Sequence, residues 1–193
     1  MRIGIYGGTF DPPHFGHLHL AVSLMEAHHL DEVWFCPAYL NPLKKHKPAS
    51  DQDRMQMLEM ATAPFPHFSI IDWELKRKGK SYTLDTVLES QSYSHQFFLL
   101  MGDKTAEEFH TWHKPEEIVN NISILIGSRQ SHPPPPPHGS KTIAEAMSRG
   151  WTTIPMFDLS STEVRGRVQK ERGIQHLVPE KIVDYIKSHR LYL

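Results

Sequence analysis

One segment near the start of the chain constrains its fold more than any other. Residues 7–17 read Gly-Gly-Thr-Phe-Asp-Pro-Pro-His-Phe-Gly-His, directly after a short apolar run at residues 3–6. An apolar-periodic stretch follows them, with apolar side chains recurring at helical spacing. This order predicts a strand, a tight glycine-rich turn and then a helix over residues 16–28.

The residue types of this segment suit the binding of a polyphosphate. Gly7 and Gly8 let the backbone turn sharply and come close to a ligand. The helix start at Gly16 and His17 offers unpaired N–H groups and the positive end of the helix dipole, which favour an anion. His14 and His17 are expected to point to the same place, where two imidazoles can stabilise charge that develops on phosphate.

Other motifs fit this segment less well. The glycine spacing does not match the dinucleotide-binding pattern G-x-G-x-x-G, and the P-loop pattern G-x-x-x-x-G-K-[ST] is absent. A metal site at His14 and His17 would need a third ligand, and no Cys, Asp or His follows nearby at a suitable spacing. We therefore expect no protein-held metal.

Composition and charge are typical of a cytoplasmic, single-domain protein. The 193 residues suit one domain, and 39% of them are hydrophobic, enough for a sizeable core. The net charge of −1 gives no reason to expect nucleic acid or a membrane as a partner. The single cysteine, Cys36, excludes an intramolecular disulfide. We see no signal segment and no apolar run of about 18 residues, and we expect a cytoplasmic location.

Strand-like and helix-like patterns alternate along the chain. Strands are expected at residues 3–6, 32–37, 68–71, 96–101, 122–126 and 152–157, and helices at 16–28, 51–63, 83–90, 105–110, 141–149, 162–172 and 179–188. Alternation of this kind indicates an α/β fold, with a Rossmann-like, doubly wound parallel sheet and helices on both faces. We expect a single domain over residues 1–193, with ligands bound beyond the carboxyl ends of the strands.

A proline run interrupts this alternation. Residues 132–139 contain five consecutive prolines, which favour an extended left-handed helix and cannot pair in a sheet. We expect a stiff surface loop, and a docking site for a partner domain is the alternative.

Strings spread over almost the whole chain resemble one family. Residues 9–17 resemble the T/H-x-G-H signature of the nucleotidylyltransferase superfamily. Strings of the bacterial nicotinate-nucleotide adenylyltransferases are matched in order at residues 37–44, 54–58, 79–86, 98–112, 159–165, 177–179 and 191–192. The string Ser81-Tyr82-Thr83 together with Trp112 points to nicotinate.

The resemblance implies transfer of the adenylyl group of ATP to nicotinate mononucleotide in NAD biosynthesis, with Mg²⁺ held mainly by the ATP phosphates. It implies catalytic roles for His17, His14, Lys44 and Arg165. The residues implied in ATP binding are Gly7, Gly8, Thr9, Phe10, Gly16, Gly102, Asp103, Ser160, Ser161 and Thr162, the last three in a helical C-terminal part at 159–193. The nicotinate nucleotide is implied to bind at Ser81, Tyr82, Thr83, Trp112 and Arg129.

Four positions depart from the family strings. Leu43 stands where the family has histidine, and Lys104 stands at the aspartate position, with Asp103 one residue early. Gln130 replaces the proline of an R-P-G string, and His113 replaces an aromatic residue. Three alternatives therefore stay open: an acceptor such as nicotinamide mononucleotide or phosphopantetheine, a non-catalytic nucleotide-binding regulator, and an adaptor that uses the proline run. Assembly into a homo-oligomer is open as well.

Overall fold

A parallel sheet organises the fold in the computed structural model, which describes residues 1–43, 47–130, 140–155 and 158–193. Its strands are β1 (Arg2–Gly8), β2 (Glu32–Pro37), β3 (Phe68–Ile70), β4 (Gln96–Gly102), β5 (Ser123–Ser128) and β6 (Trp151–Thr153). They lie in the order β3-β2-β1-β4-β5-β6, and each pairs in parallel with its neighbours. The chain switches direction across the sheet between β1 and β4, and ligands bind at such switch points in doubly wound folds.

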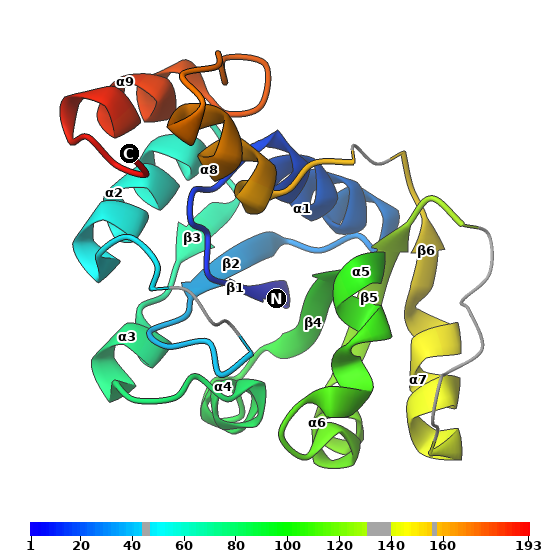
Figure 1. Cartoon of the computed structure of the whole chain (residues 1–193). Coiled ribbons are helices and arrows are strands. Elements are labelled where there is room, and N and C mark those ends of the chain that lie inside the picture. Colours follow the sequence, from blue (N-terminus) through cyan, green and yellow to red (C-terminus); the bar gives the residue numbers. More distant parts are fainter. Residues whose placement is uncertain (44–46, 131–139, 156–157) are drawn as a thin grey trace.

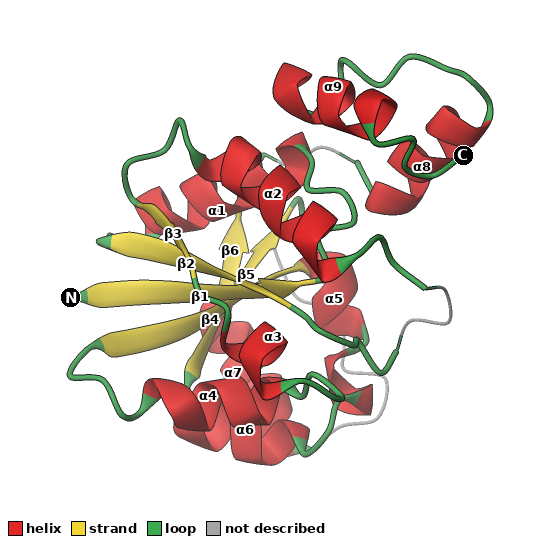
Figure 2. Ribbon diagram, turned by 90° about the vertical axis from the view of Figure 1, so that its left-hand side faces the viewer, coloured by secondary structure: helices red, strands yellow, loops and turns green. Residues whose placement is uncertain are grey.

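Helices cover both faces of this sheet (Figures 1 and 2). One face carries α1 (Phe15–Ala27), α2 (Asp51–Thr62), α8 (Ser161–Gln169) and α9 (Glu180–Ser188). The other carries α3 (Trp73–Arg77), α4 (Thr83–Ser90), α6 (Pro115–Asn121) and α7 (Lys141–Gly150). The short helix α5 (Asp103–Glu107) and the 3-10 turn η1 (Phe109–Thr111) follow β4 directly. The predicted doubly wound α/β fold is confirmed.

Strand β4 shows why a continuous apolar run forms a central strand here. Phe98 and Leu100 belong to the core that packs against α1 and α2, whereas Leu99 and Met101 belong to the core that packs against α4, α6 and α7. Neighbouring side chains of a strand point to opposite faces, so a strand with helices on both sides needs apolar residues throughout. Burial of each such side chain contributes about 1.5–3 kcal/mol.

Some elements differ from those predicted. The helix expected at 105–110 is divided into α5 and η1, and the strand expected at 152–157 is β6, which ends at Thr153. The helices α3 and α6 were not predicted, because five and seven residues are too few to show a helical repeat. Residues 156–157 and the proline run at 132–139 lie outside the described residues. None of the helices in the described ranges combines the length and the apolar character that a membrane span requires.

Candidate active site

The glycine-rich segment at residues 7–17 leaves the sheet at the carboxyl end of β1. Gly7 and Gly8 are the last residues of that strand and have no positive φ. The left-handed turn is instead made by Phe10, whose φ is 50°, so the prediction that the glycines make the turn is wrong. A Cβ at Gly7 would meet no atom within 4 Å, because the position faces a pocket. Gly7 thus leaves room for a ligand against the backbone.

Two histidines cap the start of α1 reciprocally. The His17 N–H donates to His14 Nδ1 at 3.3 Å, and the His14 N–H donates to His17 Nδ1 at 3.2 Å. Their rings stack with centroids 3.6 Å apart and 15° between the ring planes. The prediction that the two imidazoles lie together is confirmed. Since both Nδ1 atoms accept hydrogen bonds, the neutral form of each ring carries its proton on Nε2.

Burial sets the charge of His14. Its side chain is buried, and this burial lowers its pKa to about 4. The ring is therefore neutral at pH 7 and offers a phosphate an N–H donor rather than a positive charge. A Cβ at Gly16 would lie 3.1 Å from this ring, so the glycine lets the imidazole pack against the helix start.

Two pockets open at the helix start and meet there. The larger, of about 860 Å³, is lined by residues that include Gly7, Gly8, Thr9, Phe10, Ser81, Tyr82, Thr83 and Trp112. The smaller, of about 330 Å³, is lined by residues that include His14, Gly16, Gly102, Asp103, Arg129, Ser160, Ser161 and Thr162. Both pockets are lined by Tyr6, His17, Lys104 and Thr105. His17 therefore faces both spaces.

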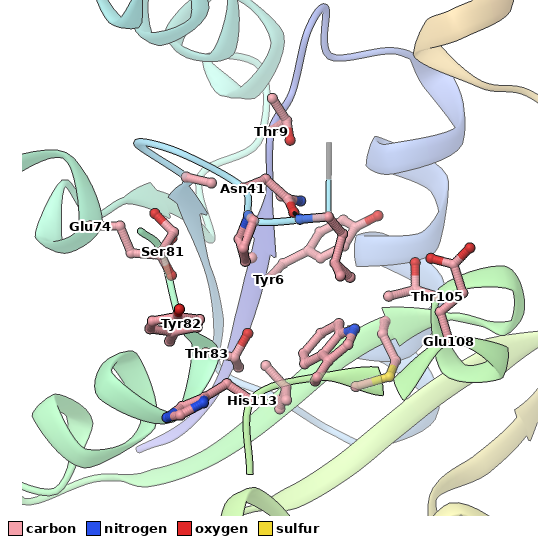
Figure 3. A pocket seen from close by; sticks show the side chains of 18 of the residues that line it. Tyr6, Thr9, Asn41, Glu74, Ser81, Tyr82, Thr83, Thr105, Glu108 and His113 are labelled. Carbon is pink, nitrogen blue, oxygen red and sulfur yellow. Dashed lines mark hydrogen bonds between the residues drawn. The ribbon is translucent and has the colours of Figure 1, made fainter. Parts of the chain in front are cut away.

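Aromatic rings border the larger pocket. Figure 3 shows Ser81 and Tyr82 on one side of the cavity and Thr105 and Glu108 on the other. The Tyr82 ring packs on His113 with centroids 4.5 Å apart. Tyr82 is also the N-cap residue of α4, and its side chain makes no capping hydrogen bond, so the pocket borders the N–H groups of a helix start. Such groups suit a carboxylate beside a flat ring.

A buried carboxylate that was not predicted from the sequence, Glu74, also lines the larger pocket. Glu74 accepts a hydrogen bond from Thr86 Oγ1 at 2.7 Å, and Arg77 donates to the same hydroxyl at 3.1 Å. These bonds join α3 to α4. The available signal was the acid–base pair Glu74 and Arg77, three residues apart just before the Ser-Tyr-Thr string.

The smaller pocket lies between two helix starts. Ser160 caps α8 by accepting a hydrogen bond from the Glu163 N–H at 3.2 Å. Ser161 donates to the Pro12 carbonyl at 2.9 Å and so joins α8 to the glycine-rich segment. At the edge of this pocket, Lys104 Nζ lies 2.6 Å from Asp158 Oδ1, and the lysine lowers the pKa of that carboxylate.

A fully buried arginine, whose role the sequence analysis did not foresee, supports the glycine-rich segment from behind. Arg54 donates to the Thr9 carbonyl at 2.8 Å and pairs with Asp51 at 2.5 Å. The available signal was a charged residue on the apolar side of α2, next to the buried Met57 and Leu58. Among the described residues, no group of three or more His, Cys, Asp and Glu side chains is placed to hold a metal ion.

Comparison with known proteins identifies the family. The cytidylyltransferase-like family matches residues 5–167. A probable nicotinate-nucleotide adenylyltransferase of Oceanobacillus iheyensis is 36% identical over 193 residues, which cover 99% of this chain and 96% of that protein. One of Bacillus pumilus is 37% identical over 194 residues, which cover 99% and 98%. This chain belongs to the nicotinate-nucleotide adenylyltransferase family.

A solved structure shares the fold of this chain. The nicotinic acid mononucleotide adenylyltransferase of Plasmodium falciparum, solved in complex with NaAD, superposes with a TM-score of 0.79 at 19% identity. The match covers 99% of this chain and 97% of that one.

The predicted site residues are divided between the two pockets, and some of them line neither pocket. Arg129 lines the smaller pocket rather than the larger pocket with Tyr82. Of the residues predicted for ATP, the smaller pocket holds Gly16, Gly102, Asp103, Ser160, Ser161 and Thr162, whereas Gly7, Gly8, Thr9 and Phe10 line the larger pocket. Arg165 is not among the residues that line either pocket, and its Nη1 donates to the Asp11 carbonyl at 2.8 Å. Lys44 lies outside the described residues, and the residues just before it, 41–43, line the larger pocket. The predicted roles of Arg129, Arg165 and Lys44 stay predictions.

Proposed function

We infer that this chain transfers the adenylyl group of ATP to nicotinate mononucleotide, giving nicotinate adenine dinucleotide and pyrophosphate in NAD biosynthesis. Similarity over the full length of nicotinate-nucleotide adenylyltransferases supports this activity. One observation supports the assignment of this activity to the site: His17 lies where a large aromatic-lined pocket meets a smaller pocket between helix starts. Two related structures are complexes with NaAD and with APC. We expect the reaction in the cytoplasm.

The larger pocket is the proposed site of nicotinate mononucleotide. A volume of about 860 Å³ lies within the usual range of ligand pockets. The rings of Tyr82 and Trp112 would enclose the pyridine ring, and the start of α4 would offer N–H groups to its carboxylate. These contacts would select nicotinate over nicotinamide, since a carboxamide lacks the negative charge that the helix start favours.

The smaller pocket is the proposed site of the ATP phosphates. The starts of α1 and α8 border it, and both bring N–H groups to an anion. We propose that ATP binds as its Mg²⁺ complex, and that the ion would be held mainly by the ATP phosphates and water. We propose that Lys44 and Arg165 neutralise the departing pyrophosphate. For Arg165 this role requires a guanidinium N–H other than the one that donates to the Asp11 carbonyl to reach a phosphate oxygen.

The proposed reaction is an in-line displacement at the α-phosphorus of ATP. An oxygen of the acceptor phosphate forms the new P–O bond, the bond to the β-phosphate breaks, and pyrophosphate leaves with the electron pair. An ionised phosphate needs no general base, so positioning and charge stabilisation supply the catalysis. The Nε2–H of His17, at the meeting point of the pockets, would donate to an α-phosphate oxygen and stabilise the charge that develops there.

Pyrophosphate release from Mg-ATP tests this function. We would measure it side by side with nicotinate mononucleotide, nicotinamide mononucleotide and phosphopantetheine, with ATP alone as the control. A clear preference for nicotinate mononucleotide is the expected result. Preference for another acceptor would keep the phosphate site and overturn the assignment of the larger pocket. No turnover with any acceptor would overturn the proposed function.

A further inference from the structure

The end of the chain returns to the glycine-rich segment at residues 7–17. The Tyr192 hydroxyl donates to Asp11 Oδ1 at 2.8 Å, across 181 positions of the sequence. Figure 2 shows this chain end beside α8. Tyr192 is half-buried, packs against the core under α1 and α2, and has a φ of 64°, which non-glycine residues seldom adopt. A hydrogen bond and packing against the core thus hold Tyr192 in place.

Asp11 is the point at which several segments meet. Its buried carboxylate accepts from the Ala49 N–H at 3.1 Å and from Tyr192, and Arg165 Nη1 lies 3.7 Å from its Oδ2. Arg165 also donates to the Asp11 carbonyl. The glycine-rich segment, the stretch that follows residues 44–46, helix α8 and the chain end are thus joined through one residue.

We propose that Tyr192 is a positioning residue for adenylyl transfer, because its hydroxyl fixes Asp11 and Asp11 fixes both Arg165 and the backbone that leads to His14. This inference rests on the proposed function. A buried carboxylate that loses one donor rotates toward the remaining ones, and small displacements of phosphate-binding groups are costly to rate. Burial and the neighbouring Asp11 carboxylate raise the pKa of Tyr192, so the phenol keeps the proton that it donates.

The chain offers a matched control in Tyr185. This residue lies in α9, in the same C-terminal part, and its hydroxyl also donates to an aspartate, Asp53 Oδ1, at 3.0 Å. Asp53 lies in the first turn of α2 and lines neither pocket. The variants Tyr192→Phe and Tyr185→Phe therefore each remove a hydroxyl that donates to an aspartate, which is buried for Tyr192 and half-buried for Tyr185.

The experiment compares both variants with the parent chain in steady-state kinetics, in calorimetric binding of Mg-ATP and in thermal melting. For Tyr192→Phe we expect kcat/KM for ATP to fall and the Kd of Mg-ATP to rise, each about 10-fold, with KM for nicotinate mononucleotide unchanged. For Tyr185→Phe, kcat/KM for ATP, the Kd of Mg-ATP and KM for nicotinate mononucleotide should each stay within about two-fold of the parent value. The Tm of Tyr192→Phe should fall further than that of Tyr185→Phe, because the carboxylate that loses a donor is the more buried one.

Three outcomes would overturn the inference: equal effects of the two substitutions, an unchanged Kd for Mg-ATP in Tyr192→Phe, or an equal change for both substrates. Any of them would leave Tyr192 with a structural role only. If the parent chain does not turn over nicotinate mononucleotide, the proposed function fails on its own. The Mg-ATP binding of the two variants then still decides the role of Tyr192.

Discussion

The two pockets of this adenylyltransferase are held in place by different means. Residues far away in the sequence fix the backbone that leads to the smaller pocket: Arg165 holds Asp11 and Ser161 holds Pro12, over separations of 154 and 149 positions. The far side of the larger pocket is instead bordered by residues of two short elements, α4 and η1. Its lining includes side chains that are exposed, such as His113.

In the proposed function, the smaller pocket serves the chemistry at the phosphates and the larger pocket selects the acceptor. Groups that stabilise a transition state act best when they are fixed before the reaction, and buried long-range hydrogen bonds supply that rigidity. The larger pocket, which we call the ring pocket because it is proposed to hold the pyridine ring, can change its lining without disturbing those bonds. We therefore expect substitutions on the phosphate side to lower turnover or stability and substitutions on the ring side to change the affinity of one substrate.

The largest effect is expected for His17→Ala, on the rigid side. Turnover should fall 10²- to 10³-fold, about 2.7–4 kcal/mol, because a donor to the developing charge is lost. Pyrophosphate release at saturating Mg-ATP and nicotinate mononucleotide measures it. His17→Asn is the control for the helix cap, since the amide oxygen can still accept from the His14 N–H, and it should melt like the parent while losing turnover as well. Near-normal turnover in His17→Ala would contradict the role of this imidazole.

Acidification should weaken the fold through His14. Its pKa is about 4 in the folded chain, against about 6.5 for an unfolded one. Between these values the unfolded chain binds a proton that the folded chain does not. The stabilisation is thus present above pH 6.5 and is lost as the pH falls toward 4, by on the order of 3 kcal/mol.

Urea unfolding at pH 7, 5.5 and 4.5 measures this loss. His14→Asn keeps a side-chain acceptor for the cap of α1 and has no imidazole, so its free energy of unfolding should fall less over this range. Parallel curves for the parent and the variant would show that another group controls the acid response. His28 is the next histidine to test, because burial lowers its pKa too.

The same contrast describes what could be predicted from the sequence. The alternation of apolar runs predicts the order of strands and helices, and the spacing of His14 and His17 predicts two imidazoles at one helix start. The contacts of Asp11 with Arg165 and Tyr192 could not be predicted, because they depend on how distant segments pack. Ring-pocket elements such as α3 were missed for a different reason: they are too short to leave a periodic pattern.

Trp112→Ala tests the larger pocket as the site of nicotinate mononucleotide. Loss of the indole should raise KM for nicotinate mononucleotide about 10-fold, in line with the 0.5–1.5 kcal/mol of an aromatic pair, and leave kcat and KM for ATP within about two-fold. Steady-state kinetics with each substrate varied in turn separates these values. Trp112→Phe retains a ring next to Phe109 and should lie between the parent and the alanine variant. An equal rise in KM for both substrates would mean that the two pockets are not independent.

The smallest effect is expected at Lys104. This residue lines both pockets and so belongs to neither one alone. Its ammonium group is paired with Asp158, and both side chains are mostly exposed. Asp158→Asn should release that charge for the ATP phosphates and lower KM for ATP about two-fold at low salt, with an unchanged Tm. The gain should vanish at roughly 1 M salt, where the Debye length is about 3 Å. Lys104→Gln should abolish the response to Asp158→Asn, and a gain confined to nicotinate mononucleotide would assign Lys104 to the larger pocket instead.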